Sequence, residues 1–114
     1  MSETYTVSLN SIIDEFALEK IFTPDNIDSI VIEKKEVNRP GLQLTGFFDH
    51  FDPLRIQIVG KVEYHYLLNL SPQKRLEAIE GLLSKHIVCL VITSGLEVFD
   101  EFYETAKKYN TPVL

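Results

Sequence analysis

The 114-residue sequence predicts a single α/β domain, a three-layer sandwich with a mostly parallel sheet. Two observations predict this class. From Arg55 onward, runs typical of buried strands alternate with helical patterns, and connections of that kind join parallel strands. The run from Ile87 to Thr93 is continuously apolar, as in a strand that helices cover on both faces. We therefore treat residues 1–114 as one domain.

The first third of the sequence predicts one helix and two short strands. A helix from Ser8 to Ala17 is expected because apolar residues recur there at helical spacing and Ser8 can cap the free amides at its start. Pro24-Asp25-Asn26 indicates a turn. Short strands are expected around residues 18–22 and at residues 29–32, where consecutive β-branched residues occur.

The segment from Asn38 to Leu54 is the least regular part of the chain, because it is rich in glycine, proline and aspartate. It also contains Phe47, Phe48 and Phe51. So much aromatic surface must pack against the domain's own core, another subunit or a ligand, and the sequence leaves these choices open. Exposed apolar patches and arginine-flanked aromatic residues are typical of interfaces, so we expect a contact surface here.

The second half of the sequence predicts three strands and three helices. The strands are residues 56–59, closed by Gly60, residues 87–93 and the start of another at residues 111–114. Ser71-Pro72 is typical of a helix start, and Asn110 can end the last helix. The expected buried faces of the three helices are Val62, Tyr66, Leu67 and Leu70; Leu76, Ile79, Leu82 and Leu83; and Phe99, Phe102, Tyr103 and Ala106.

Composition excludes several classes of function. Eleven basic and 17 acidic residues give a formal charge of −6, which disfavours a nucleic-acid-binding protein. No apolar stretch approaches the roughly 20 residues that span a bilayer, and the first residues lack a secretory signal, so we expect a cytoplasmic protein. Cys89 is the only cysteine, and its apolar surroundings predict a buried, inert thiol rather than a nucleophile or a metal ligand.

No motif for phosphate or metal chemistry is complete. Gly41 and Gly46 have the spacing of a phosphate-binding P-loop, but the lysine and Ser/Thr that must follow are replaced by Phe47 and Phe48. These glycines are better explained by backbone geometry. The cluster at residues 49–52 is expected to be a solvated loop rather than an acid/base site. Glu63 and His65, like His86, are expected at the surface.

Arg39 and Arg55 are the candidate ligand-binding residues, since each stands near glycine and aromatic residues and a guanidinium suits phosphate or carboxylate. The alternative is that each arginine binds loop carbonyls and has a structural role.

These segments resemble the amino-terminal domain of bacterial HPr kinase/phosphorylase. The resemblance runs from Asn38-Arg39-Pro40-Gly41-Leu42-x-Leu44-x-Gly46-Phe47-Phe48 through Arg55-Ile56-Gln57-Ile58-Val59-Gly60-Lys61-Val62-Glu63, and resumes at Val91-Ile92-Thr93, Gly95-Leu96 and Asn110-Thr111-Pro112-Val113-Leu114. Ser94 departs from the family, where arginine is expected, and this puts in doubt a ligand or subunit contact made there.

The resemblance implies a regulatory or assembly domain of a cytoplasmic, hexameric sensor enzyme of carbon catabolite repression. The family phosphorylates a serine of the phosphocarrier protein HPr with ATP or pyrophosphate and magnesium, and removes the phosphate by phosphorolysis. It does so in a P-loop domain that this chain lacks, so we expect no catalytic residue, cofactor or metal here. A fold similar to the uridine-nucleotide-binding domain of the Mur ligases is also implied. A domain that senses a nucleotide or sugar phosphate near Arg39, Gly41 and Arg55 is the alternative.

Overall fold

The computed structural model describes residues 6–93 and 95–114, and its centre is a parallel sheet. The strands β3 (Val37–Asn38), β4 (Ile56–Val59) and β5 (Leu90–Ile92) lie side by side in that order. Val37 is opposite Ile56, and Ile58 is opposite Val91. The α/β class with a parallel sheet is therefore confirmed.

The last residues of the chain extend this sheet beyond β5. Val113 bridges Leu90 in parallel and Phe22 in antiparallel orientation. The strand expected at residues 111–114 is thus present only as the two bridges of Val113, and the strand expected at residues 18–22 is reduced to the bridge at Phe22.

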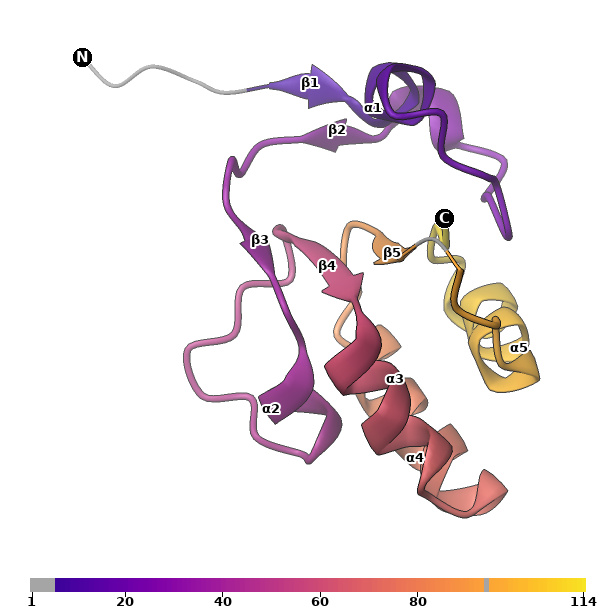
Figure 1. The fold of residues 1–114 in the computed structure, drawn as a ribbon. Coiled ribbons are helices and arrows are strands. Elements are labelled where there is room, and N and C mark those ends of the chain that lie inside the picture. The colour runs from indigo at the N-terminus through magenta and orange to yellow at the C-terminus, as the bar shows by residue number, and fades with distance from the viewer. Residues whose placement is uncertain (1–5, 94) are drawn as a thin grey trace.

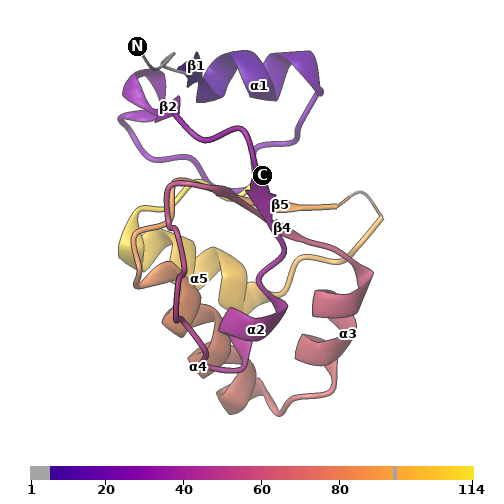
Figure 2. The same cartoon turned by 90° about the vertical axis from the view of Figure 1, so that its left-hand side faces the viewer.

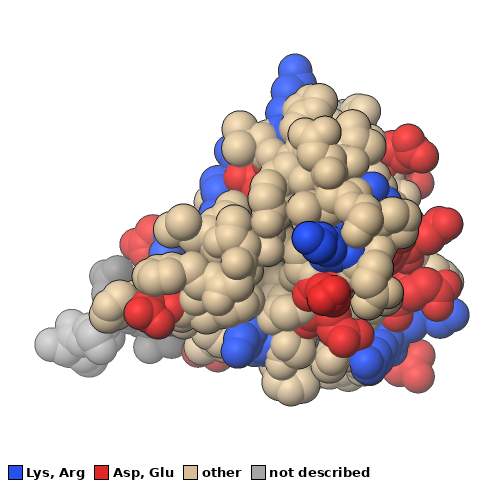
Figure 3. Space-filling view, turned by 90° about the horizontal axis from the view of Figure 1, so that it is seen from below, with Lys and Arg blue, Asp and Glu red and all other residues tan. Residues whose placement is uncertain are grey.

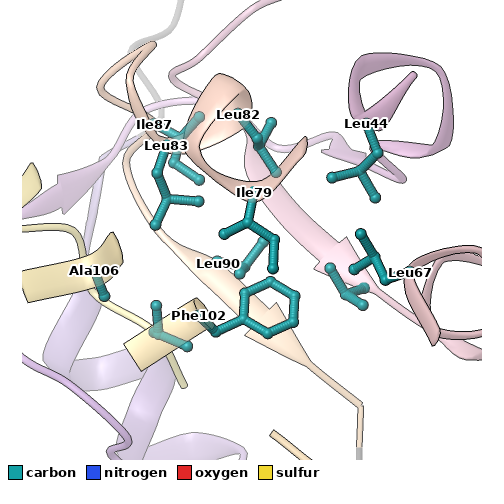
Figure 4. Close-up of a cluster of buried hydrophobic side chains, with 11 residues drawn as sticks. Leu44, Leu67, Ile79, Leu82, Leu83, Ile87, Leu90, Phe102 and Ala106 are labelled. Carbon is teal, nitrogen blue, oxygen red and sulfur yellow. The ribbon is translucent and has the colours of Figure 1, made fainter. Parts of the chain in front are cut away.

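The helices that follow the strands all cover one face of the sheet (Figures 1 and 2). They are α2 (Gly41–Leu44), α3 (Lys61–Leu68), α4 (Pro72–Leu83) and α5 (Asp100–Tyr109). Figure 4 shows the buried cluster that they share with the sheet, made of Leu44, Val59, Leu67, Ile79, Leu82, Leu83, Ile87, Leu90, Phe102, Ala106 and Val113. The main core therefore lies between the sheet and these four helices.

The opposite face of the sheet is covered by the amino-terminal segment. It contains β1 (Val7–Ser8), α1 (Leu9–Glu15), the 3-10 turn η1 (Ile27–Ser29) and β2 (Val31–Ile32), and β1 pairs with β2 in antiparallel orientation. A second buried cluster lies here, made of Leu9, Ile13, Ile32, Cys89 and Leu114. The apolar run around β5 is covered on both faces, as predicted, but one cover is a single helix with a strand pair.

Local signals placed the helix boundaries well. The Ser8 and Ser71 side chains accept hydrogen bonds from the amides of Ser11 and Lys74, and these serines cap α1 and α4. Asn110 ends α5 in the left-handed conformation, with φ of 55°. Asparagine tolerates this conformation better than most residues.

Some expectations about the elements were wrong. The strand expected at residues 87–93 is only three residues long, because Val88 donates its amide to Pro53 instead of to a strand partner. The strand expected at residues 29–32 begins at Val31. Val62 and Tyr66 are exposed, since α3 turns Glu63 and Leu67 toward the protein instead. The expected departure at Ser94 lies outside the described residues.

Charges of both signs are interspersed on the face drawn in Figure 3, and no continuous basic area forms there. Within the described ranges, no helix is both long and apolar enough to cross a membrane.

Candidate functional site

The connection between β3 and β4 carries all the candidate ligand-binding or interface residues that the sequence predicted. It leaves the carboxyl end of β3 with Arg39, forms α2 from Gly41, turns at Gly46 and returns to β4 past Arg55. Its backbone is more regular than the sequence predicted. The carboxyl end of β3 faces the start of α3, which follows β4 directly, so Arg39 lies close to the first turn of that helix.

Arg39 forms an ion pair with Glu63 of α3. The Arg39 Nε and Nη2 atoms donate to Glu63 Oε1 at 3.2 and 2.8 Å, and the Gly60 amide donates to the same oxygen at 2.8 Å. Burial would raise the pKa of Glu63, but the hydrogen bonds from Arg39 and Gly60 and the charge of Arg39 outweigh it, so its pKa lies below the ordinary value. Glu63 is therefore ionised at neutral pH, and the hydrogen bonds from Arg39 and Gly60 fix the position of its carboxylate.

This pair corrects one expectation and explains one glycine. Glu63 was expected at the surface, yet it is only 5% exposed. The helical pattern around Glu63 does not reveal this ion pair, because its partner Arg39 is 24 positions away in the sequence. A Cβ atom at Gly60 would collide with the Arg39 guanidinium, so Gly60 lets the pair form.

A chain of side-chain amides lies next to the pair. Asn38 Nδ2 donates to Gln57 Oε1 at 2.7 Å and to Gln43 Oε1 at 3.1 Å, and Gln57 Nε2 donates to the Arg55 carbonyl at 2.9 Å. Gln57 is completely buried in β4. The signal available in the sequence was a glutamine inside the apolar run of residues 56–59. This network fixes the connection to the sheet, because a buried amide without partners would be costly.

Arg55 and the two glycines have structural roles. Arg55 Nη2 donates to the Val37 carbonyl at 2.7 Å and its Nε to the Glu36 carbonyl at 3.4 Å. Gly46 has a φ of 103°, which suits glycine, and Gly41 begins α2 within 3.8 Å of the Glu63 carboxylate, measured from the position of a Cβ. These contacts agree with the structural alternative for Arg55 and with the backbone explanation of the glycines.

The three phenylalanines divide into two groups. Phe48 and Phe51 pack against the main core, with ring centroids 5.5 Å apart edge to face, and the Lys85 ammonium lies 4.6 Å from the centre of the Phe48 ring. Phe47 is 50% exposed. The single aromatic surface expected from the sequence is therefore mostly core, and only Phe47 projects from it.

The other titratable residues that the sequence analysis considered include Asp52, His65, His86 and Cys89. Asp52 accepts the Leu54 amide within its own turn and lies 3.8 Å from the Lys34 ammonium, which fits the expected solvated loop. No group of three or more potential metal ligands was found in the described part of the chain. His65 and His86 are exposed, as expected. Cys89 is completely buried, as predicted, and burial raises the pKa of its thiol to about 12.

Two cavities were not anticipated from the sequence. One, of about 420 Å³, opens between α2 and α4, with Tyr66 of α3 at its side. The other, of about 380 Å³, lies at the carboxyl end of β5 below the end of α1 and is lined mainly by apolar residues. Sequence patterns do not reveal cavities, since these depend on how elements that are distant in sequence pack together.

Comparisons with known proteins agree on one family. Residues 7–114 match the family described as HPr Serine kinase N terminus. The chain is 42% identical over 110 residues to HPr kinase/phosphorylase from Caldicellulosiruptor bescii, a match that covers 96% of this chain and 35% of the relative. It is 41% identical over 108 residues to the protein of that name from Clostridium perfringens, covering 95% and 34%. The chain thus spans about a third of the length of these curated relatives.

Proposed function

The chain belongs to the HPr serine kinase N-terminus family, and from that premise we propose that it is the noncatalytic, regulatory or assembly domain of a bifunctional HPr kinase/phosphorylase. The relatives carry that name, and Arg39, Gly60 and Glu63, which are joined by hydrogen bonds, belong to the segments that underlie the sequence resemblance. One observation carries the proposal: backbone amides in the loop from Gly41 to Phe47, which has the glycine spacing of a P-loop, are already hydrogen-bonded.

A P-loop binds phosphate through free backbone amides, but in this loop three such amides already donate hydrogen bonds within the chain. The Thr45, Gly46 and Phe47 amides donate to carbonyls of α2, at 2.9–3.2 Å. Phosphoryl transfer depends on free backbone amides, a lysine and a magnesium-binding hydroxyl that together surround the phosphates. A loop whose amides are occupied, and that continues into Phe47 and Phe48, supports a noncatalytic role.

Family membership also supports proposals about the full-length parent enzyme. We propose that the parent phosphorylates a serine of HPr with ATP or pyrophosphate and magnesium in a separate P-loop domain, and removes the phosphate by phosphorolysis. Cytoplasmic location, a hexameric assembly, a role in carbon catabolite repression and a fold similar to that of the Mur ligase domain belong to the same proposal. The small fraction of each relative that this chain covers supports the separation of the catalytic domain from this one.

A small-ligand sensor at Arg39, Gly41 and Arg55 has less support. Both guanidinium groups already bind protein atoms. Ligand crevices in open α/β sheets form where neighbouring connections leave toward opposite faces. In the described residues, α2, α3, α4 and α5 all contribute to the core on the same face.

Phosphotransfer assays test the proposal. The purified chain is incubated with HPr, magnesium and either ATP or pyrophosphate, and serine phosphorylation of HPr is measured by mass spectrometry, beside the full-length enzyme as positive control. We expect phosphate transfer from the full-length enzyme and none from the chain. Transfer by the chain above the level of a mock purification would refute the noncatalytic role.

In a second assay, the full-length enzyme and a version without the segment matched by residues 7–114 are compared for both activities and for sedimentation. A regulatory or assembly role predicts that removal changes the ratio of the two activities or the oligomeric state. If neither changes, the role is wrong.

A further inference from the structure

The cavity between α2 and α4 has an apolar lining with polar groups at its edge. Its volume of about 420 Å³ lies within the range of roughly 300–1,000 Å³ that is typical of small-molecule sites. The apolar lining consists of Leu44, Phe48, Leu70 and Ala78. Among the described residues that line the cavity, neither Arg39 nor Arg55 occurs, so this site is separate from the corner around those arginines.

Gln43 brings an unused hydrogen-bond donor to the cavity. The residue lines the cavity and is 9% exposed, and its Oε1 accepts from Asn38 Nδ2 at 3.1 Å. Its Nε2 donates to no other described residue. The orientation of the Gln43 amide is fixed, because Asn38 Nδ2 is a donor and must face an oxygen. A nearly buried donor without a partner is costly, so a ligand that offers an oxygen to Gln43 Nε2 gains affinity.

Two opposite charges stand at the edge of the cavity. Lys74 and Glu77 both line it, both side chains are exposed, and neither forms an ion pair with another described residue. They are three positions apart on α4, and side chains at this spacing are neighbours on the surface of a helix. One small molecule can therefore contact both, with a carboxylate against Lys74 and an ammonium group against Glu77.

Gly81 leaves open space beside α4. It lies inside the helix, where glycine is less favourable than alanine, and it lines the cavity. A Cβ atom at this position would meet no atom within 4 Å, so packing within the described part of the chain does not require glycine here. A glycine at such a position is explained if a bound molecule occupies the space next to the helix.

We propose that this cavity binds a small zwitterion with an apolar body, which is the chemistry of an apolar α-amino acid or of a dipeptide of such residues. The apolar body packs against the lining, and the ammonium and carboxylate groups bind Glu77 and Lys74. The Gln43 amide donates to a carboxylate or peptide oxygen of the ligand. A phosphorylated ligand fits less well, because Lys74 is the one cationic residue among the described residues that line the cavity and Glu77 beside it repels an anion.

Isothermal titration calorimetry tests the site on the purified chain with L-leucine and L-leucyl-L-leucine as probes. We expect at least one of them to bind with a Kd below about 1 mM. The N-acetylated and the amidated forms of the better probe, which each lack one charge, should bind about tenfold more weakly or worse, and so should glycylglycine, which lacks the apolar side chains. Tighter binding of either probe supports the proposal and sets the length of the ligand.

Three results of this titration would overturn the proposal. The first is no binding of either probe at about 10 mM, which is tenfold above the expected upper limit of the Kd. The second is equal affinity for the free, N-acetylated and amidated forms, because the two charges would then play no part. The third is tighter binding of glucose 6-phosphate than of both probes, which would assign the cavity to phosphorylated ligands.

Two charge variants assign the edge of the cavity. Glu77→Gln should weaken binding of the free probe about tenfold and leave the N-acetylated form unchanged, because that form has no ammonium group. Lys74→Gln should do the same for the free and the amidated forms. Glu104→Gln is the matched control, since Glu104 is exposed on α5 outside the cavity, and it should leave every Kd unchanged. Variants that weaken all forms alike, or none, contradict the assigned contacts.

Gly81→Leu tests the cavity without changing a charge. Leucine is more favourable than glycine inside a helix and its Cβ would meet no atom, so the Tm should not fall. The side chain enters the cavity, however, and should raise the Kd of the better probe about tenfold or more. A folding defect cannot produce both results, and an unchanged Kd would place the ligand elsewhere. None of these measurements involves phosphotransfer, so the ligand site and the noncatalytic role proposed above stand or fall separately.

Discussion

Arg39 and Glu63 are 24 positions apart in the sequence, yet the Arg39 Nη2 lies 2.8 Å from Glu63 Oε1. The pair joins the connection after β3 to the first turn of α3, and the Gly60 amide donates to the same carboxylate oxygen. Because Glu63 is almost completely buried, removing its charge would leave a guanidinium and an amide with a weaker acceptor.

Glu63→Gln should therefore destabilise the chain by about 1–3 kcal/mol, since it keeps the size of the side chain and loses the charge-assisted hydrogen bonds. The free energy of unfolding in urea at neutral pH measures the effect. Glu77→Gln is the matched control. Because Glu77 is exposed, this substitution should change the free energy of unfolding of the chain by less than about 0.5 kcal/mol. Equal stability of the two variants would show that the pair contributes nothing.

The same variant predicts a pH dependence. Burial raises the pKa of Glu63, but the hydrogen bonds from Arg39 and Gly60 and the charge of Arg39 bring it below its ordinary value of 4.5. A carboxylate whose pKa is lower in the folded chain stabilises the fold above the pKa of the unfolded chain, and this contribution is lost as the pH falls through the folded pKa. The stability difference between the wild type and Glu63→Gln should be full at neutral pH and shrink below a pH of 4.5. Urea titrations at a series of pH values measure it, and a difference that stays constant into acid contradicts the assigned role.

Phe47 and Phe48 should respond differently to the same substitution. Phe48 packs against the main core, with Phe51 at its edge and Lys85 over its face, so Phe48→Ala should lower the free energy of unfolding by about 2–3 kcal/mol. Phe47 is half exposed, so Phe47→Ala in the monomer should cost less than about 1 kcal/mol. Urea unfolding at low protein concentration compares them. Equal losses would mean that the two rings share one environment.

Ala17 offers a stabilising substitution. It ends α1 with a φ of 51°, in the left-handed region, while the Leu18 amide donates to the Ile13 carbonyl at 2.9 Å. Alanine is strained there and glycine is not, so Ala17→Gly should raise the free energy of unfolding by about 0.5–1 kcal/mol. Ala78→Gly is the control inside α4, where the same change should lower it by about 1 kcal/mol. Thermal melts of both variants should therefore shift in opposite directions, and a lower Tm for Ala17→Gly would contradict the strain.

The elements that depend on neighbouring residues could be predicted from the sequence alone. Ser71-Pro72 predicted the start of α4 because a serine cap and a proline at the first helical position act within one turn. Asn110 predicted the end of α5, and residues 56–59 predicted β4, for equally local reasons. The family resemblance likewise depended on short blocks of consecutive residues, and the comparisons confirmed it.

Contacts between side chains that are distant in the sequence depend on how the elements pack and could not be predicted. Val62 fits the apolar pattern of α3 and is exposed, whereas Glu63 beside it is buried because Arg39 arrives from another element to pair with it. The strand β5 is short because the Val88 amide donates to the Pro53 carbonyl. Phe48 packs against the core, whereas its neighbour Phe47 is half exposed. Periodicity reports how a side chain is oriented on its own element, but burial and pairing depend on what the rest of the chain places opposite it.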